Sequence, residues 1–474
     1  MKRIASLLLG LAMAAAALSG CGAQGRETAA QEFPDAVSIV LSDDGIIVDG
    51  KAVSTDESAA VHTAHDIVCY ESGRDFTYGE GTEADEHTAE EAEAHTVVHI
   101  TQPGTYALSG TLSAGQIAVD LGEDAEDDPA AVVTLILNGV DITCTVAPAV
   151  IFYNVYECGS TDEDTASETV DTSAAGANVL IADGTINNVT GSYVARIYDP
   201  DSVVLSEDGM TVEDSEKLHK YDGAFYSKMS MNVDGGEAGT GVLNITADNE
   251  GLDTELHLTI NGGTINITSG NDGINTNEDN VSVTTVNGGS VNIQVAGETG
   301  EGDGIDSNGD LTVSGGEIYV SGPTSDSNSA LDYDGSATVT GGTVVAAGYS
   351  GMAQNFGTDS TQGSILLTSR STSTETIRVT DASGSVLAEF TPAKAYNCVI
   401  VSTPALKQGG TYTVTMGGES TDVTLDSLIY GTGGMGGGMG GQPGGNMGTP
   451  PDGNGGSMGT PPDGNSGKGG RPGQ

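Results

Sequence analysis

The chain has 474 residues, of which 67 are Asp or Glu and 15 are Lys or Arg, so its formal net charge is -52 at pH 7. A charge of this sign and size repels nucleic acid and anionic lipid headgroups, which excludes nucleic-acid binding and favours cations or neutral partners. Glycine is frequent, with 71 residues, and tryptophan is absent, which indicates many tight turns and a flexible segment.

The N-terminus has the composition of an export signal. Two basic residues (Lys2 and Arg3) precede an apolar stretch from Ile4 to Leu18, which is shorter than the roughly 20 residues of a membrane-spanning helix. The order Leu-Ser-Gly-Cys that ends at Cys21 resembles the bacterial lipobox, and this motif predicts lipidation of Cys21. The alternative is an ordinary cleaved signal with a chance cysteine. We therefore expect a signal peptide at 1–20, a polar tether at 21–32, and an exported protein that the lipid anchor alone attaches to the outer face of the bacterial cell membrane.

Residues 33–96 are expected to form an N-terminal region of strands and loops. Alternating apolar residues indicate a first strand pair, and the Glu-, Ala- and His-rich run at 80–96 fits either a solvated loop or a short acidic helix. Four cysteines follow Cys21, namely Cys69, Cys144, Cys158 and Cys398. In an exported protein they either form disulfides, with Cys144 and Cys158 nearest in sequence, or serve as small buried residues. No zinc-ligand spacing occurs among them.

An internal repeat organises the middle of the chain. A double glycine followed by an alternating strand recurs with its first glycine at 235, 262, 288, 315 and 341, so the spacings are 27, 26, 27 and 26 residues. Short β-branched runs with period two begin at Val97, and no amphipathic helix pattern occurs between 97 and 430. A period in the twenties is typical of stacked units, and three strands of about five residues with three turns fill it. The sequence predicts an all-β protein whose residues 97–362 form a parallel β-helix.

The repeat ends before the chain does. Further apolar runs at 363–430 predict a C-terminal β cap, because an open coil end would expose core residues and strand edges. Residues 431–474 are mostly Gly, Met, Pro and Asn, too poor in apolar side chains to fold alone, and we predict a disordered Gly/Met/Pro-rich tail.

A second repeated element lies between the double glycines. Its template is polar residue, acid, Gly, apolar residue, acid, with copies at 221–225, 249–253, 271–275 and 302–306 and a looser copy at 329–332. The glycine is expected to permit positive φ or a tight bend, and the apolar residue to point into the core. The outward polar side chains would then form rows about 4.7–4.9 Å apart, the spacing of neighbouring strands.

These rows predict a calcium site. Residues 229–369 contain nineteen Asp and Glu but no Lys or Arg, so no side-chain cation of this segment offsets the stacked carboxylates. Carboxylate, amide and turn carbonyl oxygens are the ligands that Ca²⁺ takes. The predicted ligands are Asp222, Glu250, Asp253, Asp272, Asn275, Asp303, Asp306 and Asp332, with the run 303–310 as the densest candidate. The alternative is that these acids are simply solvated, which leaves their recurrence at one position unexplained.

The segment Tyr221-Asp222-Gly223-Ala224-Phe225-Tyr226-Ser227-Lys228, the Gly-Gly strands and the Asn-Asp-Gly-Ile and Gly-Asp-Gly-Ile-Asp turns resemble those of the clostridial β-helical carbohydrate-binding protein family. The similarity covers roughly residues 97–430. It implies a right-handed parallel β-helix related to pectate lyases, calcium at acidic turns, and binding to polysaccharide, namely cellulose and acidic plant sugars such as polygalacturonate. The chain departs from the family in a long insert between Asn188 and His219 and in its weaker last turn at 329–332.

Three functions are compatible with these features. We favour a carbohydrate-binding surface protein without catalysis, over a calcium-dependent polysaccharide lyase and over a structural or adhesive protein. A lyase needs a Lys or Arg base. The basic residues near the repeat are Lys217, Lys220, Lys228, Arg196 and Arg370, which we expect to pair with acids, and no catalytic residue is assigned. The sugar-contacting residues are not assigned either, and the available tyrosines are Tyr193, Tyr198, Tyr221, Tyr226, Tyr319, Tyr333 and Tyr349.

Overall fold

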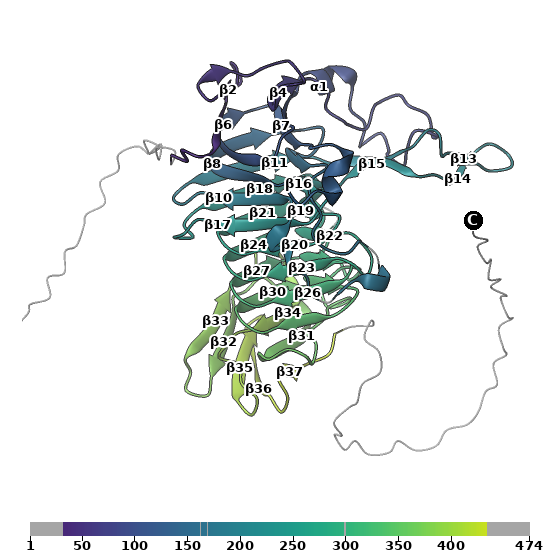
Figure 1. The fold of residues 1–474 in the computed structure, drawn as a ribbon. Helices are drawn as coiled ribbons and strands as arrows, with labels where there is room; N and C mark the ends of the chain where they lie inside the picture. Colours follow the sequence, from purple (N-terminus) through teal and green to yellow (C-terminus); the bar gives the residue numbers. More distant parts are fainter. Residues whose placement is uncertain (1–31, 162, 168, 298–299, 434–474) are drawn as a thin grey trace, which may run out of the picture. The chain divides into compact units, whose positions relative to one another are not determined.

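Short β-branched runs separated by glycine turns produce a nearly all-β fold, as the sequence predicts (Figure 1). The computed structural model describes residues 32–161, 163–167, 169–297 and 300–433. The predicted signal peptide, the lipidation site Cys21, the tether up to residue 31 and the tail from residue 434 lie outside the described residues. Among the described residues, no helix is long and apolar enough to cross a membrane.

Helical structure is confined to short segments. The acidic run at 80–96 contains helix α1 (Ala89–Glu93), which begins with a capping box because the Thr88 side chain accepts from the Glu91 amide and the Glu91 side chain accepts from the Thr88 amide. The 3₁₀ helices are η1 (Glu123–Asp127), η2 (Glu163–Thr165) and η3 (Thr172–Ala174).

One sheet has nine strands and runs the length of the repeat region. Its strands are β4 (Val61–Ala64), β5 (Thr96–Ile100), β7 (Gly115–Val119), β9 (Val150–Phe152), β16 (Gly223–Ser227), β19 (Glu250–Thr254), β22 (Ile274–Thr276), β25 (Ile305–Ser307) and β28 (Leu331–Tyr333). From β5 to β28 every neighbouring pair is parallel, whereas β4 is antiparallel to β5.

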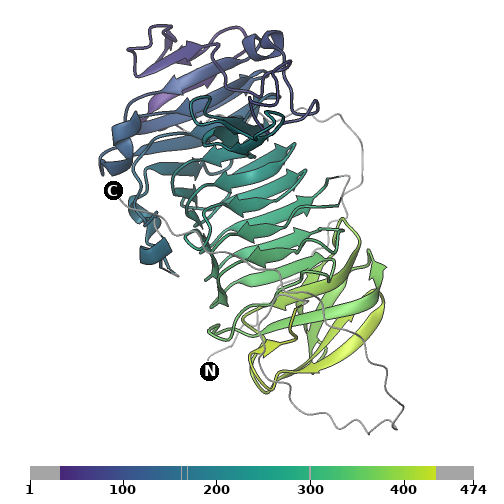
Figure 2. The same cartoon turned by 90° about the vertical axis from the view of Figure 1, so that its right-hand side faces the viewer.

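A second, twenty-stranded sheet holds two further parallel ladders, in which β8 (Val133–Thr143) pairs in parallel with β6 (Gly104–Leu112) on one side and with both β10 (Ala177–Ile181) and β11 (Ile186–Gly191) on the other. The first ladder continues through β10, β17 (Met231–Gly235), β20 (Leu258–Ile260), β23 (Val283–Val286), β26 (Asp310–Val313) and β29 (Ala337–Val339). The second continues through β11, β18 (Val242–Ala247), β21 (Thr264–Ser269), β24 (Ser290–Val295), β27 (Glu317–Ser321) and β30 (Thr343–Gly348). Three consecutive strands of the chain therefore enter three different ladders, one repeat above the next (Figure 2).

The 26–27-residue period of the sequence equals the sequence separation between paired residues on neighbouring strands of the first of these ladders. Val233 pairs with Ile260, Ile260 with Val286, Val286 with Val313, and Val313 with Val339. All five side chains are buried with the other inward aliphatic residues in one continuous core. Each fully buried side chain of this type stabilises the fold by roughly 1.5–3 kcal/mol.

The four cysteines of the described residues are free thiols. Cys69, Cys144 and Cys398 are buried, and Cys158 is half-buried. Of the two alternatives for these cysteines, the structure therefore supports small buried residues rather than disulfides.

Antiparallel strands cover both ends of the parallel stack. At the N-terminal end, β1 (Val37–Leu41) pairs in parallel with β6 (Gly104–Leu112) and antiparallel with β2 (Ile47–Val48), which pairs antiparallel with β3 (Lys51–Ala52), so the expected first strand pair is confirmed. At the other end, β34 (Tyr396–Ser402) pairs antiparallel with β30 and with β31 (Ser364–Ser373), and β37 (Ile429–Tyr430) pairs with β31. A four-stranded sheet of β32 (Ile377–Asp381), β33 (Val386–Phe390), β35 (Thr411–Met416) and β36 (Glu419–Thr424) completes this end (Figure 2).

The long insert of the sequence projects from the side of the stack (Figure 1). It consists of two antiparallel pairs, β12 (Val194–Tyr198) with β15 (Lys217–Tyr221) and β13 (Val204–Leu205) with β14 (Val212–Asp214). Its return strand β15 leads directly into β16, so Lys220 and Asp222 lie just before the start of a strand that is between β9 and β19 in the nine-stranded sheet.

The two kinds of glycine turn have different physical causes. Gly289 and Gly316, the second residues of their double glycines, have φ of 80° and 76°, a conformation that other residues rarely adopt. Gly273 is the glycine of the acidic turn element, and it does not have a positive φ. A positive φ is therefore not the reason for a glycine at this position. A Cβ there would lie 2.6 Å from the Gly304 carbonyl oxygen and closer still to Ile293, so the need is for a close approach between neighbouring strands.

We expect Gly273→Ala to lower the free energy of unfolding by about 1–3 kcal/mol, because the added methyl group overpacks the contact with the next strand. Thr268→Ala, an exposed position on the same stack, is the matched control and should change stability by less than about 0.5 kcal/mol. Equilibrium denaturant unfolding measures both. A Gly273→Ala protein as stable as the control would contradict the close-approach explanation.

Candidate metal centre

Acidic and amide side chains stack along one end of the nine-stranded sheet. Asp253 pairs with Asn275, Asn275 with Asp306, and Asp306 with Asp332. Each follows a buried core residue, so strand alternation turns its side chain away from the core. The predicted row is therefore present for these four residues.

A second row lies three residues earlier in the chain, at Glu250, the first residue of β19, and at Asp272 and Asp303, in the turns before β22 and β25. The amide of Gly251 donates to the Asp272 carbonyl oxygen at 2.9 Å, and the amide of Gly273 donates to the Asp303 carbonyl oxygen at 2.9 Å. In addition, the Asp272 carboxylate accepts from the Asp303 amide at 2.5 Å. The row ends at Ser329, whose amide donates to the Asp303 carboxylate.

The template alignment is wrong for Asp222. Gly223, not Asp222, pairs with Glu250, and Tyr226 pairs with Asp253. The reason is that Phe225 is the core residue of this strand and lies two residues after Gly223, whereas Leu252 lies one residue after its glycine. Asp222 therefore lies one position outside the row, in the turn between β15 and β16.

Asp222 nevertheless converges with two residues of the rows. Asp222, Glu250 and Asp253 each place one carboxylate oxygen within 4.8 Å of the other two. Across the described part of the chain, this is the one group of three or more His, Cys, Asp or Glu side chains that converge so closely. The densest sequence candidate, the run 303–310, does not form such a group, and Asp310 at its end accepts instead from the Ser336 amide at 2.6 Å.

Three oxygen atoms at this cluster are buried without a hydrogen-bond donor. They are Glu250 Oε2, Asp253 Oδ2 and Asn275 Oδ1. Asp253 is 0% exposed and Glu250 5%, so water does not reach them freely. An unsatisfied buried acceptor costs roughly 1–3 kcal/mol and an ionised one more, so these atoms require a cation or a proton.

The orientation of Asn275 is fixed by a residue that the sequence analysis did not identify. Asn277 donates through Nδ2 to Asp253 Oδ1 at 2.7 Å and accepts through Oδ1 from Asn275 Nδ2 at 2.9 Å. Asn275 is thereby turned so that its carbonyl oxygen remains unpaired. Asn277 follows Asn275 by two residues and so shares its side of the strand, a signal that strand alternation could have supplied.

Burial sets the acid–base properties of both rows. Burial, with Asp253, Asp272 and Asp222 as like charges, raises the pKa of Glu250 well above its ordinary value. Burial and neighbouring carboxylates raise the pKa of Asp253 in the same way. Burial also raises the pKa of Asp303 to about 8 and that of Asp306 to about 7. Protons therefore neutralise these carboxyls when no cation does.

Comparison with known protein families identifies the family of this chain. A family model described as carbohydrate-binding domain-containing protein matches residues 94–420, more than half of the chain. The chain belongs to this family. The resemblance noted in the sequence is thus confirmed, and the match includes every predicted ligand of the two rows as well as Asp222.

Individual relatives of this carbohydrate-binding domain-containing protein are distant. A carbohydrate-binding domain-containing protein of Acetivibrio thermocellus is 28% identical over 167 residues, which are 35% of this chain and 43% of that protein. The chain thus spans less than half of the length of this curated relative. The solved structure of a polysaccharide lyase-like protein from C. thermocellum aligns with 65% of this chain and 93% of its own, at 20% identity and a TM-score of 0.33.

Four of the five basic residues near the rows of this family member pair with acids, as expected, whereas among the described residues Arg370 has no ion pair. Lys217 contacts Glu255 at 2.9 Å, Lys228 contacts Glu126 at 2.7 Å, and Arg196 contacts Glu80 at 2.9 Å. Lys220 reaches the cluster itself, with Nζ 2.5 Å from Asp222 Oδ2. Burial raises the pKa of Asp222 more than Lys220 lowers it, so one lysine does not offset the cluster.

We expect the chelator-treated protein to lose stability as the pH rises from about 4 to about 8. Because the pKa of Asp303 rises from 3.8 in the unfolded chain to about 8, the folded state retains a proton in this interval that the unfolded state releases. Each such carboxyl lowers the free energy of unfolding by up to about 1.4 kcal/mol per pH unit. Carboxyls whose pKa is lowered, such as that of Asp183, change the free energy of unfolding only at a pH below this interval.

Denaturant midpoints between pH 4.5 and 8.5 measure this effect. Asp303→Asn should make the decline shallower, and Asp234→Asn, which replaces a half-exposed acid outside both rows, should leave it unchanged. Stability that stays level or increases over this interval would show that the buried carboxyls are not protonated in the folded state.

Proposed function

We propose that this protein binds carbohydrate through calcium held at the acidic rows, without catalysis, and that it does so at the cell surface. The observation that carries the proposal is the set of buried, unpartnered oxygen atoms of Glu250, Asp253 and Asn275 at a cluster of three carboxylates. Membership of the carbohydrate-binding domain-containing family supports the ligand class. The surface location rests on the lipobox that ends at Cys21, through which a lipid would anchor the exported chain.

We further infer that the three ladders form a right-handed parallel β-helix. The constant parallel registers and the return of every third strand to the same ladder support this arrangement. The right hand is the one that parallel crossover connections adopt almost without exception.

The donor set fits calcium. Ca²⁺ takes six to eight oxygen ligands at about 2.3–2.6 Å, and carboxylates and amide oxygens are both common among them. Asp222, Glu250 and Asp253 would hold the ion, with Asn275 as a neutral ligand that Asn277 orients. The absence of His and Cys from the group disfavours zinc and copper.

Calcium would supply the positive charge that a uronate carboxylate requires near a chain with a net charge of -52. The other groups of the site are side chains of the protein. Glu250 and Asp253 are buried and would hold an ion in place, whereas Asp306 and Asp332 further along the row are half-buried and would be accessible to a sugar. The binding surface would therefore lie along the row rather than at its buried end.

A calcium-dependent polysaccharide lyase is the second candidate, and Lys220 is the observation that favours it. A lysine beside a calcium ion is placed where an abstracting base would be needed. Burial lowers the pKa of Lys220, but Asp222, Glu250 and Asp253 together outweigh burial and raise it. In the absence of a metal ion these carboxylates keep Lys220 protonated at neutral pH and therefore a poor base, which supports binding over elimination.

We expect EDTA to lower the melting temperature at pH 7.5, because removing the ion leaves the cluster to be neutralised by protons. Calcium should restore it, and Asp253→Asn should abolish the response to both. Asp234→Asn is the control and should respond as the unmodified protein does. Scanning calorimetry at constant ionic strength measures the shift, and a melting temperature that EDTA leaves unchanged would refute the calcium proposal.

We also expect polygalacturonate to bind in calcium and to dissociate when EDTA is added. The same assay should show no increase in absorbance from unsaturated product over the time of binding. An increase that Lys220→Ala abolishes would establish the lyase instead. Failure to bind any polysaccharide, with calcium binding intact, would favour a structural or adhesive role.

A further inference from the structure

A second surface, on a different parallel ladder from the acidic rows, has the chemistry of a different ligand. Outward side chains of β18, β21 and β24 form a ladder of asparagines in register. Asn292 Nδ2 donates to Asn266 Oδ1 at 3.0 Å, Asn266 to Asn244 at 2.8 Å, and Asn244 to Asn188 at 2.9 Å. Asn244 and Asn266 each use one N–H in the ladder and keep a second one for a ligand, whereas Asn292 also donates to Ser290 Oγ at 3.3 Å and offers its carbonyl oxygen.

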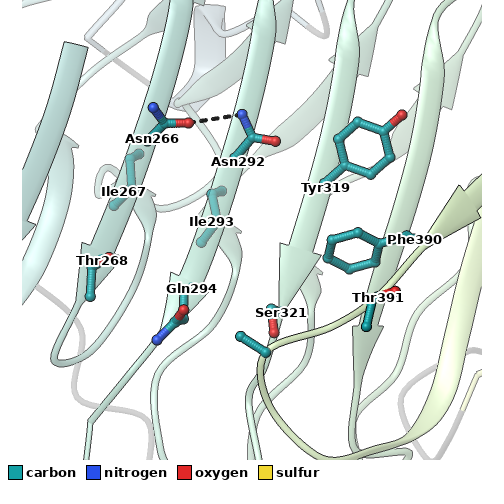
Figure 3. Close-up of a pocket in the computed structure, with 11 residues that line it drawn as sticks. Asn266, Ile267, Thr268, Asn292, Ile293, Gln294, Tyr319, Ser321, Phe390 and Thr391 are labelled. Atoms are coloured by element: carbon teal, nitrogen blue, oxygen red, sulfur yellow. Dashed lines mark hydrogen bonds between the residues drawn. The ribbon is translucent and has the colours of Figure 1, made fainter. Parts of the chain in front are cut away.

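The ladder ends against an aromatic pair. On the next strand, β27, Tyr319 occupies the position that Asn292 has on β24, and the Asn292 carbonyl oxygen points toward it (Figure 3). The Tyr319 ring lies 5.3 Å from the ring of Phe390, which belongs to β33 of the C-terminal sheet, with 35° between the ring planes. The two rings therefore form one apolar platform beside a row of amides.

These residues line a groove of about 240 Å³. Its floor comes from β21, β24 and β27, and its wall comes from the end of β33 and the loop after it, so both the coil stack and the C-terminal sheet contribute (Figure 3). The amide of Lys394 in this loop donates to Ser321 Oγ at 2.9 Å and attaches the wall to the floor.

The lining is uncharged in a strongly acidic chain. Its polar groups are the amides of Asn266, Asn292 and Gln294 and the hydroxyls of Thr268, Ser321 and Thr391, with the Tyr319 phenol at the platform. The nearest acids along the lining strands are Glu317 and Glu389, which do not line the groove, and Glu389 is paired with Arg378 at 2.5 Å. A lining with neither sign of charge selects a neutral ligand, because a charged ligand would lose its hydration without gaining a counter-charge.

We propose that this groove binds a neutral, extended glycan chain and does so without calcium. The C–H faces of pyranose rings would pack on Tyr319 and Phe390, and the ring hydroxyls, which both donate and accept, would pair with the free amide groups. Two strand spacings are roughly 9.5 Å, so amides on alternate strands repeat at about the length of a disaccharide in an extended chain. The inference rests on the proposed function only in taking carbohydrate as the ligand class, and its site and its ion requirement are separate.

The test compares two ligands on the full chain. Isothermal titration with cellohexaose, an extended neutral oligosaccharide, should give the same affinity in calcium and in EDTA. Tyr319→Ala and Phe390→Ala should each weaken it by about ten-fold or more, the loss expected for a buried aromatic anchor. Polygalacturonate binding in calcium should be unchanged in both variants, which shows that they are folded. Phe76→Ala removes an exposed phenylalanine away from the groove and is the matched control.

A third variant guards against indirect effects of losing an aromatic side chain. Asn292→Asp keeps the size of the residue, places a charge in the groove and should also weaken cellohexaose binding. Maltohexaose, a curved chain of the same sugar, should bind more weakly than cellohexaose to the unmodified protein.

Unchanged cellohexaose affinity in all three variants, or dependence of that affinity on calcium, would overturn the proposal. Absence of cellohexaose binding together with normal polygalacturonate binding would overturn it and leave the calcium-dependent function intact. A change of oligomeric state in Tyr319→Ala, seen by light scattering without loss of sugar binding, would assign the groove to a second copy of the chain.

Discussion

Parallel pairing at a fixed register places equivalent side chains of successive repeats one strand spacing, about 4.8 Å, apart. The backbone hydrogen bonds between strands impose this spacing whatever the side chains are, so every outward position becomes a row of side chains from successive repeats. A row of aliphatic residues benefits, since it buries apolar area continuously. A row of polar residues is stable only when its members can satisfy one another or are satisfied by something bound.

The two faces of the stack handle this constraint in different ways. An asparagine carries both a donor and an acceptor, so Asn188, Asn244, Asn266 and Asn292 satisfy one another and the ladder is stable without a ligand. A carboxylate only accepts, so Glu250, Asp272 and Asp303 cannot do the same when they are ionised. Their raised pKa values record that deficit in the absence of an ion. The acidic face thus requires a partner to be fully stable, whereas the amide face only offers contacts to one.

This difference also decides what the sequence could reveal. The 26–27-residue period, the three strands per repeat and the rows at Asp253, Asn275, Asp306 and Asp332 follow from short-range pattern, and the pairing registers match them. The position of Asp222 could not be predicted in this way. One additional residue before Phe225 shifts the strand, and a template aligned on its glycine does not detect that shift. Lys220 was expected to pair with an acid, but its partner could not be predicted, since nothing local shows that the insert returns its last strand to the cluster. Phe390 is 71 residues from Tyr319 and belongs to a sheet whose packing on the stack no repeat encodes.

Because the two faces are separate, one chain could bind both a uronate, which requires a cation, and a neutral glycan, which requires none. Carboxylates at the acidic rows would repel a uronate unless a cation intervenes, and the same long-range charge raises the cost of bringing any anion to the amide face. A neutral glycan is insensitive to that field, so an uncharged groove functions equally well with or without the ion. The insert that carries Lys220 and the C-terminal sheet that carries Phe390 each contribute to one face. Both are additions to the repeat. The repeat itself therefore supplies regular rows, and the non-repeating segments turn a row into a site at the place where they contact it.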